Sequence, residues 1–86
     1  MGNTTGTVTV RYFAAAADAA GRATEIIELE PGATLGHLVD ELVARHGDEM
    51  KRVLSVAAYL RGDELTRDLT SLVGVQVDVL PPFAGG

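Results

Sequence analysis

Apolar and polar residues alternate in two stretches near the start of the chain. In 7–13 one face of the alternation carries the apolar side chains Val8, Val10 and Tyr12. A period of two is typical of a strand with one face against a core. The pattern returns in 24–29, where two adjacent isoleucines favour extended backbone. We therefore predict two strands joined as a hairpin, with 14–21 as the long loop between them.

The spacing of apolar residues changes to three and four after the break at Pro31-Gly32. A helix with one apolar stripe has this spacing, and the residues of the stripe are Leu35, Leu38, Val39, Leu42 and Val43. Thr34 is placed to cap the helix and Gly47 to end it. We expect 48–54 to add a further helical turn with Met50, Val53 and Leu54 facing inward.

The remaining residues predict a strand over 55–60, a turn at 61–64 and a last strand over 75–80. Proline cannot donate to a strand ladder, so Pro81-Pro82 ends this last strand. The order is strand, strand, helix, strand, short connecting strand, strand. It predicts an α+β fold of the β-grasp type, a mixed sheet of four to five strands with one main helix packed on one face.

Length and composition fit one folded domain over 1–86, because 86 residues leave no room for a second core and 47% of them are hydrophobic. The net charge of −5 disfavours nucleic acid and anionic membranes as partners. The absence of cysteine excludes disulfides, thiolate catalysis and the common zinc sites. Neither an export signal nor an apolar run of membrane-spanning length is recognised, which predicts a cytoplasmic protein.

Signatures of a self-contained active site are missing from the sequence. There is no phosphate-binding glycine loop and no suggestive spacing of serine, histidine and aspartate. His37 and His46 lie nine residues apart without a neighbouring set of ligands, so we interpret them as solvated helix residues and expect no metal site. The chain is accordingly expected to have no catalytic machinery of its own.

The informative segment is the end of the printed sequence, where Pro81-Pro82 is followed by Phe83, Ala84, Gly85 and Gly86. Two glycines have no Cβ and can therefore enter a narrow channel in another protein. A terminal carboxylate there is ionised at pH 7 and can attack the α-phosphate of ATP to give an acyl-adenylate. We predict that 81–86 is a flexible functional tail, held away from the domain by the two prolines. The alternative is a terminal segment without function.

Two apolar residues are out of phase with their strands. Phe13 follows the polar face of the first strand, and Leu80 shares the polar face of the last one. Together with Leu65, after the turn, they could form an exposed apolar patch beside the tail. The alternative is that a twist or a bulge at the strand ends resets the phase.

Three segments together resemble the MoaD/ThiS group of ubiquitin-like sulfur carriers and, within it, the small subunits of molybdopterin synthases. They are Val10-Arg11-Tyr12-Phe13-Ala14 running to Gly21, the helix start Thr34-Leu35, and Val77 to Gly86 with the ending Pro-Pro-x-x-Gly-Gly. The resemblance covers nearly the whole chain from Thr7 onward. It implies a β-grasp carrier that acts as a co-substrate of a sulfurtransferase.

The resemblance also implies the reaction and its partners. A ubiquitin-activating-like adenylyltransferase uses ATP on the carboxylate of Gly86, and a persulfide donor then gives a thiocarboxylate, with no tightly bound cofactor. The large subunit, in a two-plus-two assembly, would take Phe83, Ala84, Gly85 and Gly86 into its pocket to sulfurate precursor Z in molybdenum cofactor biosynthesis. The partner-binding residues implied are Phe13, Leu65, Leu80, Pro81 and Pro82.

Three other interpretations stay open. The same sulfur chemistry could serve thiamin, cysteine or tRNA thiolation. Gly86 could instead form isopeptide bonds with lysines, as in a ubiquitin-like protein modifier. A β-grasp interaction module with an inert tail is the remaining possibility.

Overall fold

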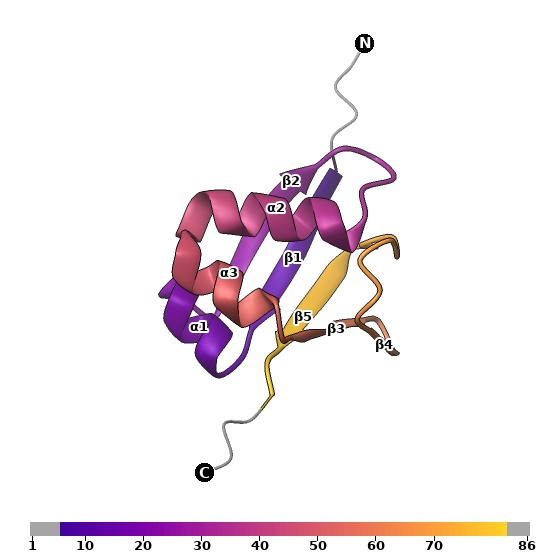
Figure 1. Cartoon of the computed structure of the whole chain (residues 1–86). Coiled ribbons are helices and arrows are strands. Elements are labelled where there is room, and N and C mark those ends of the chain that lie inside the picture. The colour runs from indigo at the N-terminus through magenta and orange to yellow at the C-terminus, as the bar shows by residue number, and fades with distance from the viewer. Residues whose placement is uncertain (1–5, 83–86) are drawn as a thin grey trace.

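A five-stranded mixed sheet forms the frame of the protein in a computed structural model, which describes residues 6–82 (Figure 1). The strands are β1 (Gly6–Tyr12), β2 (Thr24–Leu29), β3 (Ala58–Arg61), β4 (Glu64–Thr66) and β5 (Gln76–Leu80). They lie in the order β2-β1-β5-β3-β4, and β1 and β5 are parallel while the other neighbours are antiparallel. The predicted β-grasp fold is thus confirmed.

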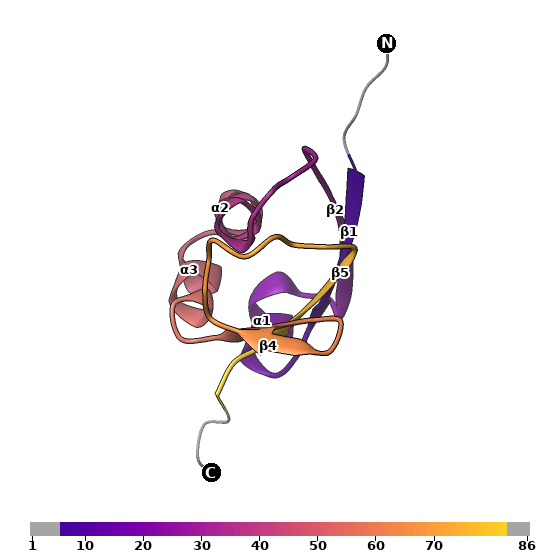
Figure 2. The same cartoon turned by 90° about the vertical axis from the view of Figure 1, so that its right-hand side faces the viewer.

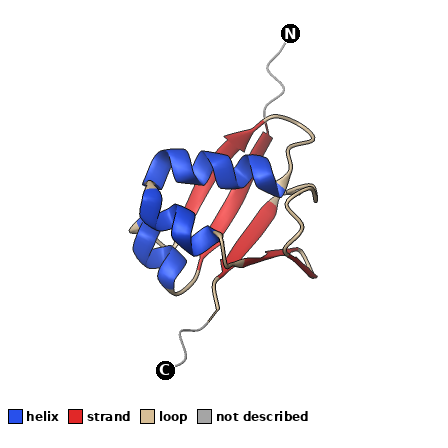
Figure 3. Cartoon of the chain, in the orientation of Figure 1, coloured by secondary structure: helices blue, strands red, loops and turns tan. Residues whose placement is uncertain are grey.

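Three helices cover one face of this sheet and leave the other face open (Figures 2 and 3). They are α1 (Ala15–Ala20), α2 (Leu35–His46) and α3 (Asp48–Leu54). The start of α2 is fixed by a reciprocal cap: the His37 N–H donates to Thr34 Oγ1 at 3.2 Å, and the Thr34 N–H donates to His37 Nδ1 at 3.0 Å. Within residues 6–82 no helix is long and apolar enough to cross a membrane.

The core lies between the helices and the sheet. Of the side chains predicted to face inward from the first strand and from α2, Val39 and Val43 are half-buried and the others are buried. The largest fully buried side chains of the core are Tyr59, Ile27, Leu35, Leu38, Leu42 and Met50. Each of the aliphatic ones contributes about 1.5–3 kcal/mol by leaving water. The Tyr59 hydroxyl donates to the Leu54 carbonyl oxygen at 3.1 Å, and burial raises the pKa of Tyr59 to about 12. This bond ties the end of α3 to the sheet.

Two sequence predictions are wrong in detail. Residues 14–21 are not a plain loop, because 15–20 form α1, which ends at Gly21 in the left-handed conformation. Alanine has the highest helix propensity, but its small side chain gives no readable apolar stripe. The strand predicted to start at residue 55 starts at Ala58, because Ser55 still has helical backbone angles at the end of α3. The sheet is therefore covered by three helices rather than by one main helix.

Candidate functional site

A row of paired residues crosses the open face of the sheet. Arg11 of β1 lies opposite Asp78 of β5, Asp78 lies opposite Leu60 of β3, and Leu60 lies opposite Leu65 of β4. Residues that lie opposite each other on neighbouring strands point to the same face. The neighbours of Arg11 and Asp78 along their strands, Tyr12 and Val79, are buried on the helix side, so this row points away from the helices.

A second row lies beside the first, where β1 and β5 end. Tyr12 is the register partner of Val79, so the following residues, Phe13 and Leu80, come next to each other, and Leu80 lies opposite Ala58. The guanidinium carbon of Arg11 lies 5.7 Å from the centre of the Phe13 ring, which places this ring on the open face. We call the apolar side chains of the two rows the apolar corner; they are Phe13, Ala58, Leu60, Leu65 and Leu80.

The structure therefore brings together three of the residues predicted to bind a partner. Phe13 is 41% exposed and Leu65 is 62% exposed, while Leu80 is half-buried between its neighbours. The continuous register of β5 against both β1 and β3 contains no bulge that would turn Leu80 to the other face. An exposed cluster of this kind is typical of a surface that another protein covers.

An ion pair between Arg11 and Asp78 lies beside the apolar corner. Arg11 Nε donates to Asp78 Oδ1 at 2.8 Å, and Arg11 Nη2 donates to Asp78 Oδ2 at 2.6 Å. The hydrogen bonds from Arg11 hold the pKa of the buried Asp78 below its ordinary value, although burial acts in the opposite direction. This fork fixes the guanidinium plane and so places Arg11 against Phe13.

The tail begins directly after the corner. Pro81 follows β5 and is buried, whereas Pro82 is exposed. Of these two residues, predicted to bind a partner, Pro82 has an accessible ring, whereas the domain itself covers Pro81. The predicted tail residues Phe83, Ala84, Gly85 and Gly86 lie outside the described residues. Their roles remain predictions.

The apolar corner suits binding more than chemistry. It combines apolar surface with one internally neutralised ion pair, which is the composition of a protein-binding patch. Within residues 6–82 no group of three or more histidine, aspartate and glutamate side chains could hold a metal ion. A hollow of about 530 Å³ lies at the other end of β1, between the loops 30–33 and 72–75.

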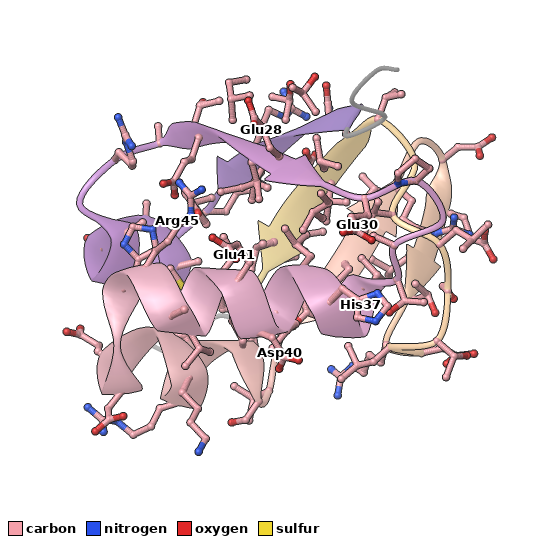
Figure 4. The ribbon with its side chains drawn as sticks, turned by 90° about the horizontal axis from the view of Figure 1, so that it is seen from above. Glu28, Glu30, His37, Asp40, Glu41 and Arg45 are labelled. Carbon is pink, nitrogen blue, oxygen red and sulfur yellow. The ribbon has the colours of Figure 1, made fainter. Side chains whose placement is uncertain are left out.

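A second polar cluster, around Glu25, was not predicted from the sequence. Glu25 is 7% exposed on the helix face of β2. Its carboxylate accepts a hydrogen bond from the Tyr12 hydroxyl at 2.6 Å, lies 2.8 Å from His46 Nε2 and accepts one from Arg45 Nη1 at 3.3 Å. Figure 4, seen from above, shows Arg45 between β2 and α2. The cluster thus fixes the end of α2 to the sheet, on the face opposite the apolar corner.

Electrostatics of this cluster follow from burial and hydrogen bonds. Burial raises the pKa of Glu25, but the hydrogen bonds from Tyr12 and His46 outweigh it and leave the pKa of Glu25 below its ordinary value. Burial and the contact with Glu25 both raise the pKa of Tyr12. The prediction that both histidines are solvated is wrong for His46, whose side chain is 13% exposed. His37 is exposed and caps α2.

Sequence reasoning also missed Ala58, Leu60 and the pairing of Arg11 with Asp78. The phase of the last strand puts Asp78 and Leu80 on one face, but the pairing of Asp78 with Arg11 depends on the position of β5 beside β1. No sequence pattern marks Leu60 as part of the patch, because its position between Asp78 and Leu65 depends on strand register.

Comparisons with known proteins agree with this geometry. The family model described as "ThiS family" matches residues 10–86. SAMP1 from Haloferax volcanii is 27% identical with a TM-score of 0.78, over 94% of this chain and 100% of that chain. A Pyrococcus furiosus protein provisionally assigned as molybdopterin converting factor, subunit 1, is 26% identical with a TM-score of 0.74, over 88% of this chain and 97% of that chain.

Another solved structure supports the fold alone. The Haloferax volcanii HVO 2177 protein is 21% identical with a TM-score of 0.79, over 100% of this chain and 92% of that chain. No curated protein sequence matches this chain. The likeness therefore rests on the family model and on solved structures that share about a quarter of their residues with it.

Proposed function

The chain belongs to the ThiS family of ubiquitin-like sulfur carriers, and from this premise we propose that it is the sulfur-carrying small subunit of a molybdopterin synthase. The observation that carries the proposal is the apolar corner, which lies where β5 runs into Pro81, Pro82 and the diglycine segment. A carrier needs a docking surface beside the group that it delivers. The similarity to an assigned molybdopterin converting factor subunit favours this branch of the family.

Loading of the carrier starts at the carboxylate of Gly86. This oxygen attacks the α-phosphate of ATP, which forms an acyl-adenylate and releases pyrophosphate. The terminal sulfur of a protein persulfide then attacks the acyl carbon and AMP leaves. A thiol reductant cleaves the remaining sulfur–sulfur bond, so the carrier ends in a thiocarboxylate. Because the chain has no cysteine, all the sulfur comes from the donor.

Delivery of sulfur uses both parts of the site. The apolar corner docks on the large subunit, whose residues do the catalysis, and 83–86 enters its pocket. Glycine at the last two positions keeps the tail narrow enough to reach the substrate. Two loaded carriers, in a two-plus-two assembly, provide the two dithiolene sulfurs that convert precursor Z to molybdopterin. The chain itself is then a co-substrate without catalytic residues.

Intact mass spectrometry tests the loading step. The chain is incubated with a ubiquitin-activating-like adenylyltransferase, ATP and a persulfide donor, and we expect a gain of about 16 Da from one oxygen replaced by sulfur. A variant with one tryptophan appended after Gly86 is the control and should gain nothing. An unchanged mass of the chain itself would contradict sulfur carriage.

Transfer to the pterin is tested separately. Loaded chain is mixed with the large subunit and precursor Z, and we expect molybdopterin to form while the carrier returns to its unloaded mass. Loading without pterin conversion would contradict the molybdopterin role and leave carriage for thiamin, cysteine or tRNA thiolation. The two measurements thus separate the general proposal from the specific one.

A protein modifier is the second candidate. It is favoured by the likeness to SAMP1, which is described as small archaeal modifier protein 1. In that case the activated carbonyl of Gly86 is attacked by a lysine amine of a target protein, which forms an isopeptide bond and releases AMP. Covalent conjugates in cell extract that disappear when Gly86 is deleted would support this function.

A further inference from the structure

The outer edge of β2 is open. The Tyr12 N–H donates to the Ala23 carbonyl oxygen at 2.8 Å, which makes these two residues a hydrogen-bonded pair of the antiparallel hairpin. Every second residue of β2 from Ala23 therefore turns its backbone groups toward β1. The alternate residues turn their backbone N–H and C=O groups to the free edge, where these groups have no hydrogen-bond partner within residues 6–82. These residues are Thr24, Ile26 and Glu28.

This edge lacks most of the features that keep edge strands from pairing. The register of β2 against β1 runs without a bulge over six residue pairs, and 24–29 contains no proline. Ile26 lies near the middle of the strand and is 56% exposed. In Figure 4, which looks down on β2 and α2, Glu28 lies on the side of β2 away from α2. Charged side chains are the remaining protection, so their arrangement decides what can pair here.

One register makes β2 complementary to a second copy of itself. When two β2 strands run antiparallel about a two-fold axis at Ile26, each Ile26 faces its equivalent and Glu28 faces Thr24. Just beyond the two ends of β2, the same register brings Glu30 of each copy near Arg22 of the other. Both are exposed, Glu30 has no ion pair within residues 6–82, and Arg22 has only a 3.5 Å contact with Glu25. The pairing therefore joins opposite charges at both ends of the strand.

Neighbouring registers are less favourable. An axis at Glu25 or at Glu28 sets that residue against its own equivalent, which places like charges opposite each other. An axis at residue 27 turns Ile26 against Glu28 and leaves Arg22 without an acidic partner. Compared with these three alignments, the sequence of β2 favours the axis at Ile26.

We propose that two copies of this chain associate through β2, antiparallel about a two-fold axis at Ile26, so that two five-stranded sheets become one continuous sheet. In the order β2-β1-β5-β3-β4, four of the five residues of the apolar corner lie on β5, β3 and β4, Phe13 follows β1, and none belongs to β2. Partner docking at the corner and pairing at β2 are therefore compatible. The proposal goes beyond sulfur carriage and does not depend on it, because its tests measure association of the chain alone.

A single introduced cysteine tests the two-fold axis. The chain has no cysteine, so the variant Ile26→Cys carries one thiol. In a hydrogen-bonded antiparallel pair the two Cα atoms are about 5.5 Å apart, within the range that a disulfide spans. We expect mild oxidation to give a disulfide-linked dimer. The control is Val75→Cys, at a site that is 82% exposed and outside β2, which should stay mostly monomeric. Equal cross-linking of the two variants would overturn the proposal.

Charge exchange tests the register. Sedimentation of the full chain over a concentration series should show monomer and dimer in equilibrium. We expect Glu30→Arg to raise the dissociation constant about tenfold or more, because two attractive contacts become repulsive. Adding Arg22→Glu should restore association, and the matched control Glu49→Arg on α3 should leave it unchanged. A monomer at every concentration, an unaffected Glu30→Arg variant, or an edge that takes a peptide strand instead would each overturn the proposal.

Discussion

Two buried carboxylates lie on opposite faces of the same sheet, and their surroundings differ. Glu25 faces the helices and contacts side chains of β1 and α2. Asp78 faces the open side, where its main partner is Arg11 on the neighbouring strand. The first cluster joins two layers of the fold, whereas the second joins two strands that are already paired by their backbones.

This difference explains what each face does. Removing the Glu25 side chain would leave the Tyr12 hydroxyl and His46 without their acceptor inside the protein, which costs stability. The Arg11–Asp78 pair instead lies on the open face, beside apolar side chains that remain exposed, and it orients Arg11 against Phe13. We infer that the helix face holds most of the stability and the open face most of the binding. The predictions below test this division.

The largest effect is expected from Glu25→Gln. The amide keeps the shape of the side chain but cannot accept hydrogen bonds with both of its ends, so the cluster loses part of its bonding. We expect the free energy of unfolding in urea to fall by about 2–3 kcal/mol. Affinity for the large subunit of the proposed synthase should change little. A stability equal to that of the unmodified chain would show that α2 is held by apolar packing alone.

Phe13→Ala is expected to have a smaller effect, and on binding rather than on stability. The ring is 41% exposed and lies outside the hydrophobic core, so the free energy of unfolding should stay within about 0.5 kcal/mol. Binding to the large subunit, measured by titration calorimetry, should weaken by about tenfold, or 1.4 kcal/mol. The comparison of two faces fails if this variant loses stability and keeps its affinity.

Acid should weaken the Glu25 cluster. The pKa of Glu25 is lower in the folded chain than its ordinary value, so its contribution to stability is present above the unfolded value and is lost as pH falls through the folded one. We expect the stability difference between the unmodified chain and Glu25→Gln to shrink when urea unfolding is repeated below about pH 4. If this stability difference does not change with pH, it does not come from the charge of Glu25.

The smallest effect is expected from Val75→Asp. Val75 is 82% exposed and outside both the core and the apolar corner. Stability and affinity for the large subunit should each change by less than about 0.5 kcal/mol. A clear loss of affinity would extend the binding surface to the opposite end of β5.

Local patterns were sufficient for much of the fold. The alternation of Val8, Val10 and Tyr12 fixed the inward face of β1, and the stripe from Leu35 onward with its Thr34 cap located α2. Helix α1 was not predicted, because a run of alanines has no apolar stripe that distinguishes one face from another. The burial of His46 was not predicted, because its partner Glu25 lies 21 residues away on another element.

For the candidate site, the sequence indicated the members but not their arrangement. Phe13 and Leu80 were recognisable because each breaks the phase of its strand. Their proximity to Leu60 and Leu65 depends on how β5 is inserted between β1 and β3. No local pattern encodes that insertion.

The sequence by itself determined which residues of β1 face the core, where α2 begins and which segment ends in two glycines, because these follow from side-chain spacing and from local backbone preferences. Only the tertiary structure decided that Arg11 pairs with Asp78, 67 residues further along the chain, and that the apolar side chains beside them form one surface. The physical reason is that strand register is set by the packing of the whole sheet against its helices, so residues remote in sequence become neighbours only when the core has formed.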